Sequence, residues 1–155
     1  MDQAKLDFIT NKYVLLLKGL PADAIGRWGK MNAQQMVEHV SGFFKVSTEK
    51  LQFPLLTPVE HLPKFKEFLF SDKEFRENTK APGSVVPENP LPVRKGSMTE
   101  AIAELQNEIV AFVDFFKNNS GRKTTHPVFG ELNFEEWVLL HYKHVMHHLR
   151  QFELM

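Results

Sequence analysis

Cysteine is absent from the chain, and this absence excludes three kinds of chemistry. Without cysteine the protein has no disulfide bond, no thiolate metal ligand and no cysteine nucleophile. Any metal ion would therefore be bound through nitrogen and oxygen atoms. The lack of disulfides also fits a reducing compartment, and we expect a cytoplasmic protein.

The chain also lacks an excess of either charge and lacks any long apolar run. Lys and Arg number 19, as do Asp and Glu, so there is no basic surplus to neutralise phosphates. No stretch has the length and apolar content of a membrane span, and the N-terminus lacks the pattern of a secretory signal. We therefore expect a soluble protein whose partners include neither nucleic acid nor a membrane.

What the chain does contain is enough apolar material for one core. It has 155 residues, of which 43% are hydrophobic, and 14 of them are Phe. A chain of this size buries a good core, and no change of composition along it marks a second unit. The sequence predicts a single domain over residues 1–155.

Four segments carry apolar residues at every third or fourth position, which is typical of amphipathic helices. The first covers residues 6–20, and the others begin at the expected N-caps Asn32, Ser97 and Asn133. Each cap is followed three residues later by Gln or Glu, as in a capping box. No segment alternates like a strand, and TTHPVFGEL before the last helix is expected to be a turn. The predicted fold is all-α, a four-helix bundle.

Residues 50–96 differ from the rest because they hold seven of the nine prolines. We expect a long Pro-rich crossover between the second and third helices, either mobile or packed as a lid over a site. A short helix starts at Pro63, and its Phe65, Phe68 and Phe70 exceed the needs of one short helix. We expect these side chains to pack on the body of the molecule or on a second subunit, with plain surface packing as the alternative, and we predict a homodimer.

The last helix is unusual because four of the seven histidines fall within eight residues. His144 and His148 are four positions apart, so both project from one face and suit one divalent metal ion. His141 shares that face one turn earlier, whereas His147 points to the side. The alternatives are hydrogen-bonded core histidines or a solvated tract near the chain end. Several metal-free imidazoles on one seam would each need a buried partner, which favours a metal site.

A further histidine, His39, lies on the core side of the second helix, between Met36 and Phe43. Alone it would be a hydrogen-bonded core residue, but together with the last helix it becomes a third candidate ligand. His61 lies in the Pro-rich segment and is expected at the surface. No carboxylate shares the face of the histidine pair, and Glu38 points elsewhere, so the sequence offers no general base.

Two motifs, EHVSGFF with His39 and KHVMHHLRQF with His144 and His148, resemble the DinB-like/YfiT superfamily of metal-binding four-helix bundles. The segment HPVFGELNFEEW is similar to a branch of that superfamily whose function is unknown. The resemblance covers most of the chain and implies His39, His144 and His148 as metal ligands. It implies no ligand role for three other histidines, which are His126, His141 and His147.

Three imidazole ligands leave a coordination position open for water or substrate, which is typical of catalytic metal sites. Zinc is the expected metal, with nickel or iron as alternatives that also accept nitrogen ligands. The resemblance implies a metal-dependent enzyme, a hydrolase or an S-transferase that uses a low-molecular-weight thiol and a small-molecule substrate. The alternative is a non-catalytic metal- or ligand-binding bundle of the stress response. The sequence does not indicate which residues are catalytic.

Overall fold

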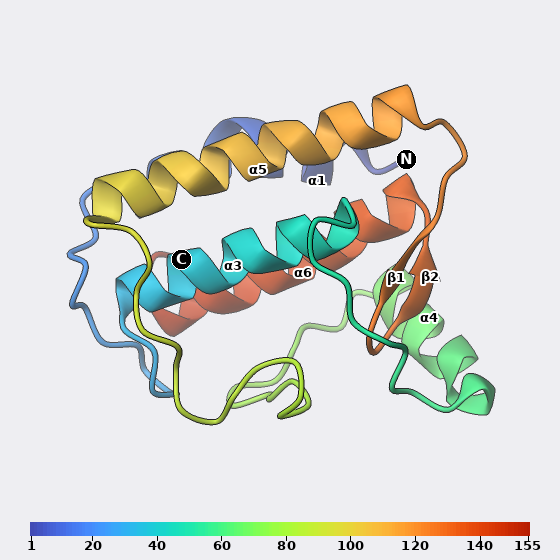
Figure 1. Cartoon of the computed structure of the whole chain (residues 1–155), viewed down its shortest axis with the longest axis horizontal. Coiled ribbons are helices and arrows are strands. Elements are labelled where there is room, and N and C mark those ends of the chain that lie inside the picture. The colour runs from blue at the N-terminus through green and yellow to red at the C-terminus, as the bar shows by residue number, and fades with distance from the viewer.

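A computed structural model describes residues 1–155 and shows a mainly helical molecule with a small sheet at one end (Figure 1). The N-terminal helix consists of two α-helical segments joined by a π-helical turn, η1. A 3-10 turn, η2, precedes the short helix in the crossover. The elements in chain order are α1 (Gln3–Asp7), η1 (Phe8–Lys12), α2 (Tyr13–Leu17), α3 (Ala33–Ser47), η2 (Val59–His61), α4 (Leu62–Phe70), α5 (Met98–Asn118), β1 (Thr124–His126), β2 (Gly130–Leu132) and α6 (Phe134–Gln151).

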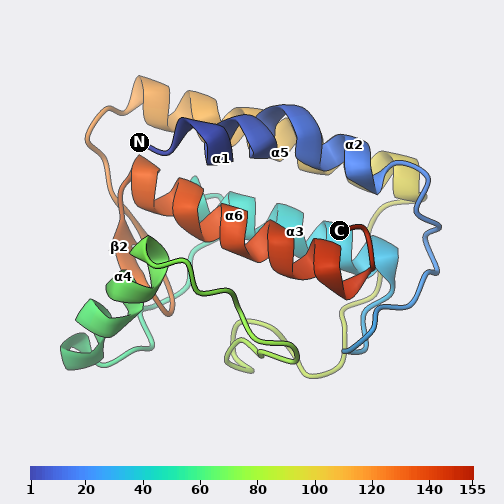
Figure 2. The ribbon, with the colours of Figure 1, turned by 180° about the vertical axis from the view of Figure 1, so that it is seen from behind.

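The helices pack around one apolar core. Helix α3 contacts both α5 and α6, and the N-terminal helix contacts α5 and α6 from the other side (Figures 1 and 2). Trp137, Tyr13, Phe44 and Phe112 are the largest of the buried side chains that fill the space between these helices. None of the helices is both long and apolar enough to cross a membrane.

The expectation of an all-α four-helix bundle is wrong, because residues expected to be a turn form an antiparallel hairpin. Thr124 pairs with Leu132, and His126 pairs with Gly130. Gly130 has a φ of +80°, which favours glycine at the start of the returning strand. The Thr124 hydroxyl donates to the Ser47 carbonyl at 2.8 Å and so ties the hairpin to α3. The molecule therefore combines helices with a two-stranded sheet.

The expected helix starts are confirmed, with one difference in detail. Asn32 and Asn133 each form a reciprocal capping box with the residue three positions later. Ser97 also accepts a hydrogen bond from the Glu100 amide, at 3.2 Å. The Glu100 carboxylate, however, accepts from the amide of Gly96 at 2.8 Å instead of closing the box at Ser97. Helices α3, α5 and α6 therefore begin where their caps predicted, whereas the N-terminal helix, expected from residue 6, begins at Gln3.

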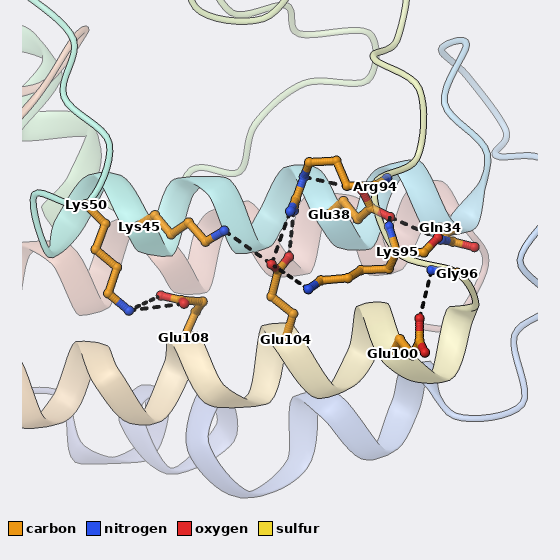
Figure 3. A network of polar contacts seen from close by, with 10 residues as sticks. All are labelled: Gln34, Glu38, Lys45, Lys50, Arg94, Lys95, Gly96, Glu100, Glu104 and Glu108. Carbon is orange, nitrogen blue, oxygen red and sulfur yellow. Dashed lines mark hydrogen bonds and ion pairs between the residues drawn. The ribbon is translucent and has the colours of Figure 1, made fainter.

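The Pro-rich crossover includes α4. After α4 it passes along the side of α3 and α6 that faces away from α5, and it ends at the start of α5 (Figures 1 and 2). Its end is fixed by a polar network between α3 and α5 (Figure 3). The Glu38 carboxylate, on a residue that is 8% exposed, accepts from the amides of Arg94 at 2.7 Å and Lys95 at 3.3 Å. The Arg94 guanidinium in turn donates two hydrogen bonds to Glu104 on α5.

Candidate metal centre

Three histidines that are far apart in the sequence meet between α3 and α6. The Nε2 atom of His144 lies 3.0 Å from Nε2 of His39 and 3.0 Å from Nε2 of His148. One ligand atom from each ring lies within 4.8 Å of the other two. In tetrahedral zinc coordination with Zn–N bonds of ~2 Å, ligand nitrogens stand ~3.3 Å apart. The spacing of the three rings is close to that of a three-histidine metal site.

Helix geometry explains why the three rings meet. His144 and His148 are one turn apart on α6, so their rings meet on one face, edge to face, with centroids 4.7 Å apart. His39 reaches the same point from the neighbouring α3, and Phe43, one turn further along α3, lies edge-on to His39 and His144. His148 is buried, whereas His39 and His144 are half-buried. The cluster therefore has a closed side at His148 and a partly solvent-accessible side.

The three ring nitrogens that face one another cannot all be paired in hydrogen bonds. A ring nitrogen carries either a proton or a lone pair, so Nε2 of His144 cannot make a hydrogen bond to both of its neighbours. The single proton or lone pair on this atom points in one direction, so at most one of the two 3.0 Å contacts is a well-aligned hydrogen bond. A divalent cation would accept all three lone pairs at once, so these residues fit a metal ion.

Burial keeps the three rings in the form that binds metals. Burial, with a smaller contribution from nearby His147, lowers the pKa of His39 to about 4. Burial and the neighbouring histidines lower the pKa values of His144 and His148 well below the ordinary value. The rings are therefore neutral near pH 7, and a neutral imidazole is the form that coordinates a metal.

His148 has a second contact, on the side of the ring away from the cluster. Its Nδ1 lies 2.7 Å from Oε1 of Gln151, and Nε2 of Gln151 donates to the carbonyl of Trp28 at 2.8 Å. The helical spacing places Gln151 on the face of the histidine pair, but the sequence gives no role for it. The Trp28 carbonyl is a backbone group in a loop, so no side-chain pattern indicates it.

The other histidines of the last helix lie outside the cluster. The ring of His141 stacks on Phe44 with centroids 3.9 Å apart, and its Nε2 is buried without a hydrogen-bond partner. The His147 ring packs between Trp28 and Phe75, with centroids at 5.2 Å and 5.9 Å. Both side chains belong to the packing of the molecule.

The two remaining histidines also have separate places. His126 ends β1, and its Nδ1 accepts from the amides of Val128 at 3.0 Å and Phe129 at 3.2 Å. It thereby fixes the turn of the hairpin, which the sequence did not indicate. His61 is exposed in η2, as expected. No carboxylate belongs to the histidine cluster, and Glu38 is engaged by the end of the crossover.

The fold and the site define a mainly helical protein with a half-open three-histidine cluster. Residues 4–155 match the family model described as "Protein of unknown function (DUF1569)", and the chain belongs to this family. No curated protein and no solved structure matches the chain significantly. The family description assigns no activity, so the histidine cluster is the feature of this chain that indicates a function.

Proposed function

We propose that this protein is a metal-dependent enzyme whose divalent ion is bound by His39, His144 and His148. The observation that carries the proposal is the convergence of three Nε2 atoms, with 3.0 Å contacts from His144 to both other rings. Zinc suits this set of neutral nitrogen donors, and nickel or iron are the alternatives. Three protein ligands leave a coordination position for a small-molecule substrate.

The surroundings of the cluster favour one of the two reaction classes that the DinB-like/YfiT resemblance implies. Phe43 lies against His39 and His144, and the nearest carboxylate along α3, Glu38, binds backbone amides of the crossover. A thiol that coordinates a metal loses its proton without a protein base, whereas hydrolysis gains from a positioned base. Transfer of a low-molecular-weight thiol therefore fits this chain better than hydrolysis.

The test is an assay of the zinc-loaded protein with a low-molecular-weight thiol and an activated electrophile, and in parallel with an activated ester. We expect thiol transfer that depends on zinc and is lost in His39→Ala. Ester hydrolysis without thiol transfer would make the protein a hydrolase.

Stoichiometric metal binding without turnover in either assay would favour the alternative, a non-catalytic metal- or ligand-binding protein. Thiol transfer that persists in His39→Ala and after removal of all metal would contradict the proposal.

A further inference from the structure

Gln151 connects the histidine cluster to the loop that contains Trp28. The residue ends α6, is 2% exposed, and lies three positions after His148. Both ends of its side-chain amide are used: one faces Nδ1 of His148 at 2.7 Å, and the other faces the Trp28 carbonyl at 2.8 Å. The amide is therefore held between a candidate ligand and a backbone group.

The Trp28 carbonyl decides the direction of these hydrogen bonds. A carbonyl oxygen only accepts, so the NH₂ end of the Gln151 amide must face it. The amide oxygen then faces Nδ1 of His148 and also only accepts, so Nδ1 must carry the proton. In the neutral ring this leaves the lone pair on Nε2, the atom that faces His144. A backbone carbonyl thus fixes the tautomer of a ring in another element.

The loop at residues 26–29 is shaped to hold Gln151 in this position. A Cβ atom at Gly26 would lie 2.8 Å from Cγ of Gln151, closer than side chains approach. A Cβ at Gly29, whose φ is +79°, would lie 2.9 Å from Nε2 of Gln151. The amide of Arg27 donates to the Gln151 backbone carbonyl at 2.7 Å. The loop therefore makes hydrogen bonds with both the backbone and the side chain of Gln151.

We infer that Gln151, held by residues 26–29, is a positioning residue that sets His148 in the tautomer and orientation needed to bind a metal ion. The inference rests on the proposed metal site. Partners that orient a metal-binding histidine contribute about 10-fold to 100-fold to metal affinity. A loss of that size is the expected effect of removing the Gln151 amide.

The first test uses Gln151→Met, which keeps the length of the side chain and removes both hydrogen bonds. Nitrogen-15 NMR of the metal-free protein reports which ring nitrogen of His148 carries the proton. We expect Nδ1–H in the starting protein and a mixture of tautomers in Gln151→Met. Zinc affinity, measured by competition with a chelator, should fall about 10-fold to 100-fold. Gln151→Glu keeps an acceptor for Nδ1–H and should retain the tautomer, with an affinity between the other two.

A second test leaves Gln151 in place and changes only its support. Gly26→Ala pushes against Cγ of Gln151, and it should weaken zinc binding and mix the His148 tautomers in the same way. Gly83→Ala is the matched control, because no heavy atom lies within 4 Å of its added Cβ. It should change neither readout. If Gln151→Met does not fold, Gly26→Ala and Gln151→Glu decide the question.

Zinc binding by the starting protein tests the metal site, and the effects of the variants test the role of Gln151. If the starting protein binds no zinc, the metal site is wrong, while the tautomer measurement still tests the role of Gln151. If the starting protein binds zinc but Gln151→Met and Gly26→Ala keep both the affinity and the Nδ1–H tautomer, the positioning role is wrong and the metal site stands.

Discussion

At the residue scale, His141 and His144 are one turn apart on α6 but have different surroundings. The His141 ring stacks on Phe44 and Trp137, with centroids at 3.9 Å and 5.2 Å, and is fully inside the core. His141→Ala should lower the free energy of unfolding by about 3 kcal/mol, as for large aromatic truncations, and keep the metal. His144→Ala should lose the metal. Denaturant unfolding and elemental analysis of both variants check this prediction.

The control for both variants is His61→Ala, because that side chain is exposed in η2 and should affect neither stability nor metal content. His126→Ala should also keep the metal, although it removes the acceptor in the hairpin turn. The assignment of ligands would be wrong if His141→Ala lost the metal while His144→Ala kept it.

The sequence could predict the three histidines of the cluster, but not the hydrogen bonds through which Gln151 and the Trp28 carbonyl hold His148. The helical repeat places His144 and His148 on one face, and His39 becomes the third candidate only together with them and with the family resemblance. The hydrogen bond from Gln151 to the Trp28 carbonyl spans 123 positions of the chain. Such a contact depends on how a loop packs on a helix end, and no local periodicity carries that information.

At the scale of elements, Glu38 anchors the end of the crossover on α3. Its carboxylate accepts from two backbone amides of the crossover and from Nε2 of Gln34 at 3.1 Å. Glu38→Ala should lower the free energy of unfolding by about 2 kcal/mol, because a buried charged acceptor is lost. Trypsin cleavage after the exposed Arg76 and Lys80 should become faster as the crossover detaches more often.

Glu88→Ala is the matched control within the crossover. Its side chain is 77% exposed and its ion pair with Lys30 is 3.7 Å long. An exposed pair of this kind contributes little, so both stability and cleavage rate should stay unchanged. Equal effects of the two substitutions would show that Glu38 is not the anchor.

The elements themselves divide into those with a local signal and those without one. Asn32 and Asn133 fix helix starts through contacts within four residues, so the sequence shows them. The hairpin strands are three residues long, too short to show alternation. Their position depends on distant partners of the Thr124 hydroxyl, the Ser47 carbonyl and Nε1 of Trp137. Circular dichroism should therefore show dominant helix with a small strand contribution.

At the scale of the whole molecule, the buried histidines make the metal-free protein sensitive to acid. Burial lowers the pKa of His39 to about 4 and that of His126 to about 3, and lowers the pKa of His141 well below its ordinary value. In the unfolded chain each pKa is ~6.5, so between pH ~6.5 and ~4 the unfolded state binds more protons. Stability is therefore full above pH ~6.5 and falls as the pH is lowered.

Each such histidine contributes a slope of up to about 1.4 kcal/mol per pH unit. Urea unfolding at pH 7.5, 6 and 5 measures this loss. The window is separate from that of Glu104, whose pKa Arg94 lowers to about 2, so that its contribution is lost only in stronger acid. An unchanged unfolding midpoint between pH 7.5 and pH 5 would contradict the burial of neutral histidines.

The homodimer stays a prediction. Of the three Phe residues in α4 that suggested it, only Phe70 is exposed enough to contact a second subunit. Phe65 and Phe68 pack on Phe129 within one chain, with centroids at 5.5 Å and 6.3 Å. Phe70 is 61% exposed and remains free for a second subunit. Light scattering should give a dimer, and Phe70→Ser should weaken it. A monomer at high micromolar concentration would rule the dimer out.

Elemental analysis of the purified protein shows whether His39, His144 and His148 bind one metal ion. The protein should be purified without an affinity tag or nickel resin, so that no metal comes from the procedure. We predict a metal-to-chain ratio of about one for the unchanged protein and His141→Ala, and no stoichiometric metal in His144→Ala. A ratio near zero that zinc addition does not raise, or an equal ratio in His144→Ala, would show that these three histidines do not bind a metal ion.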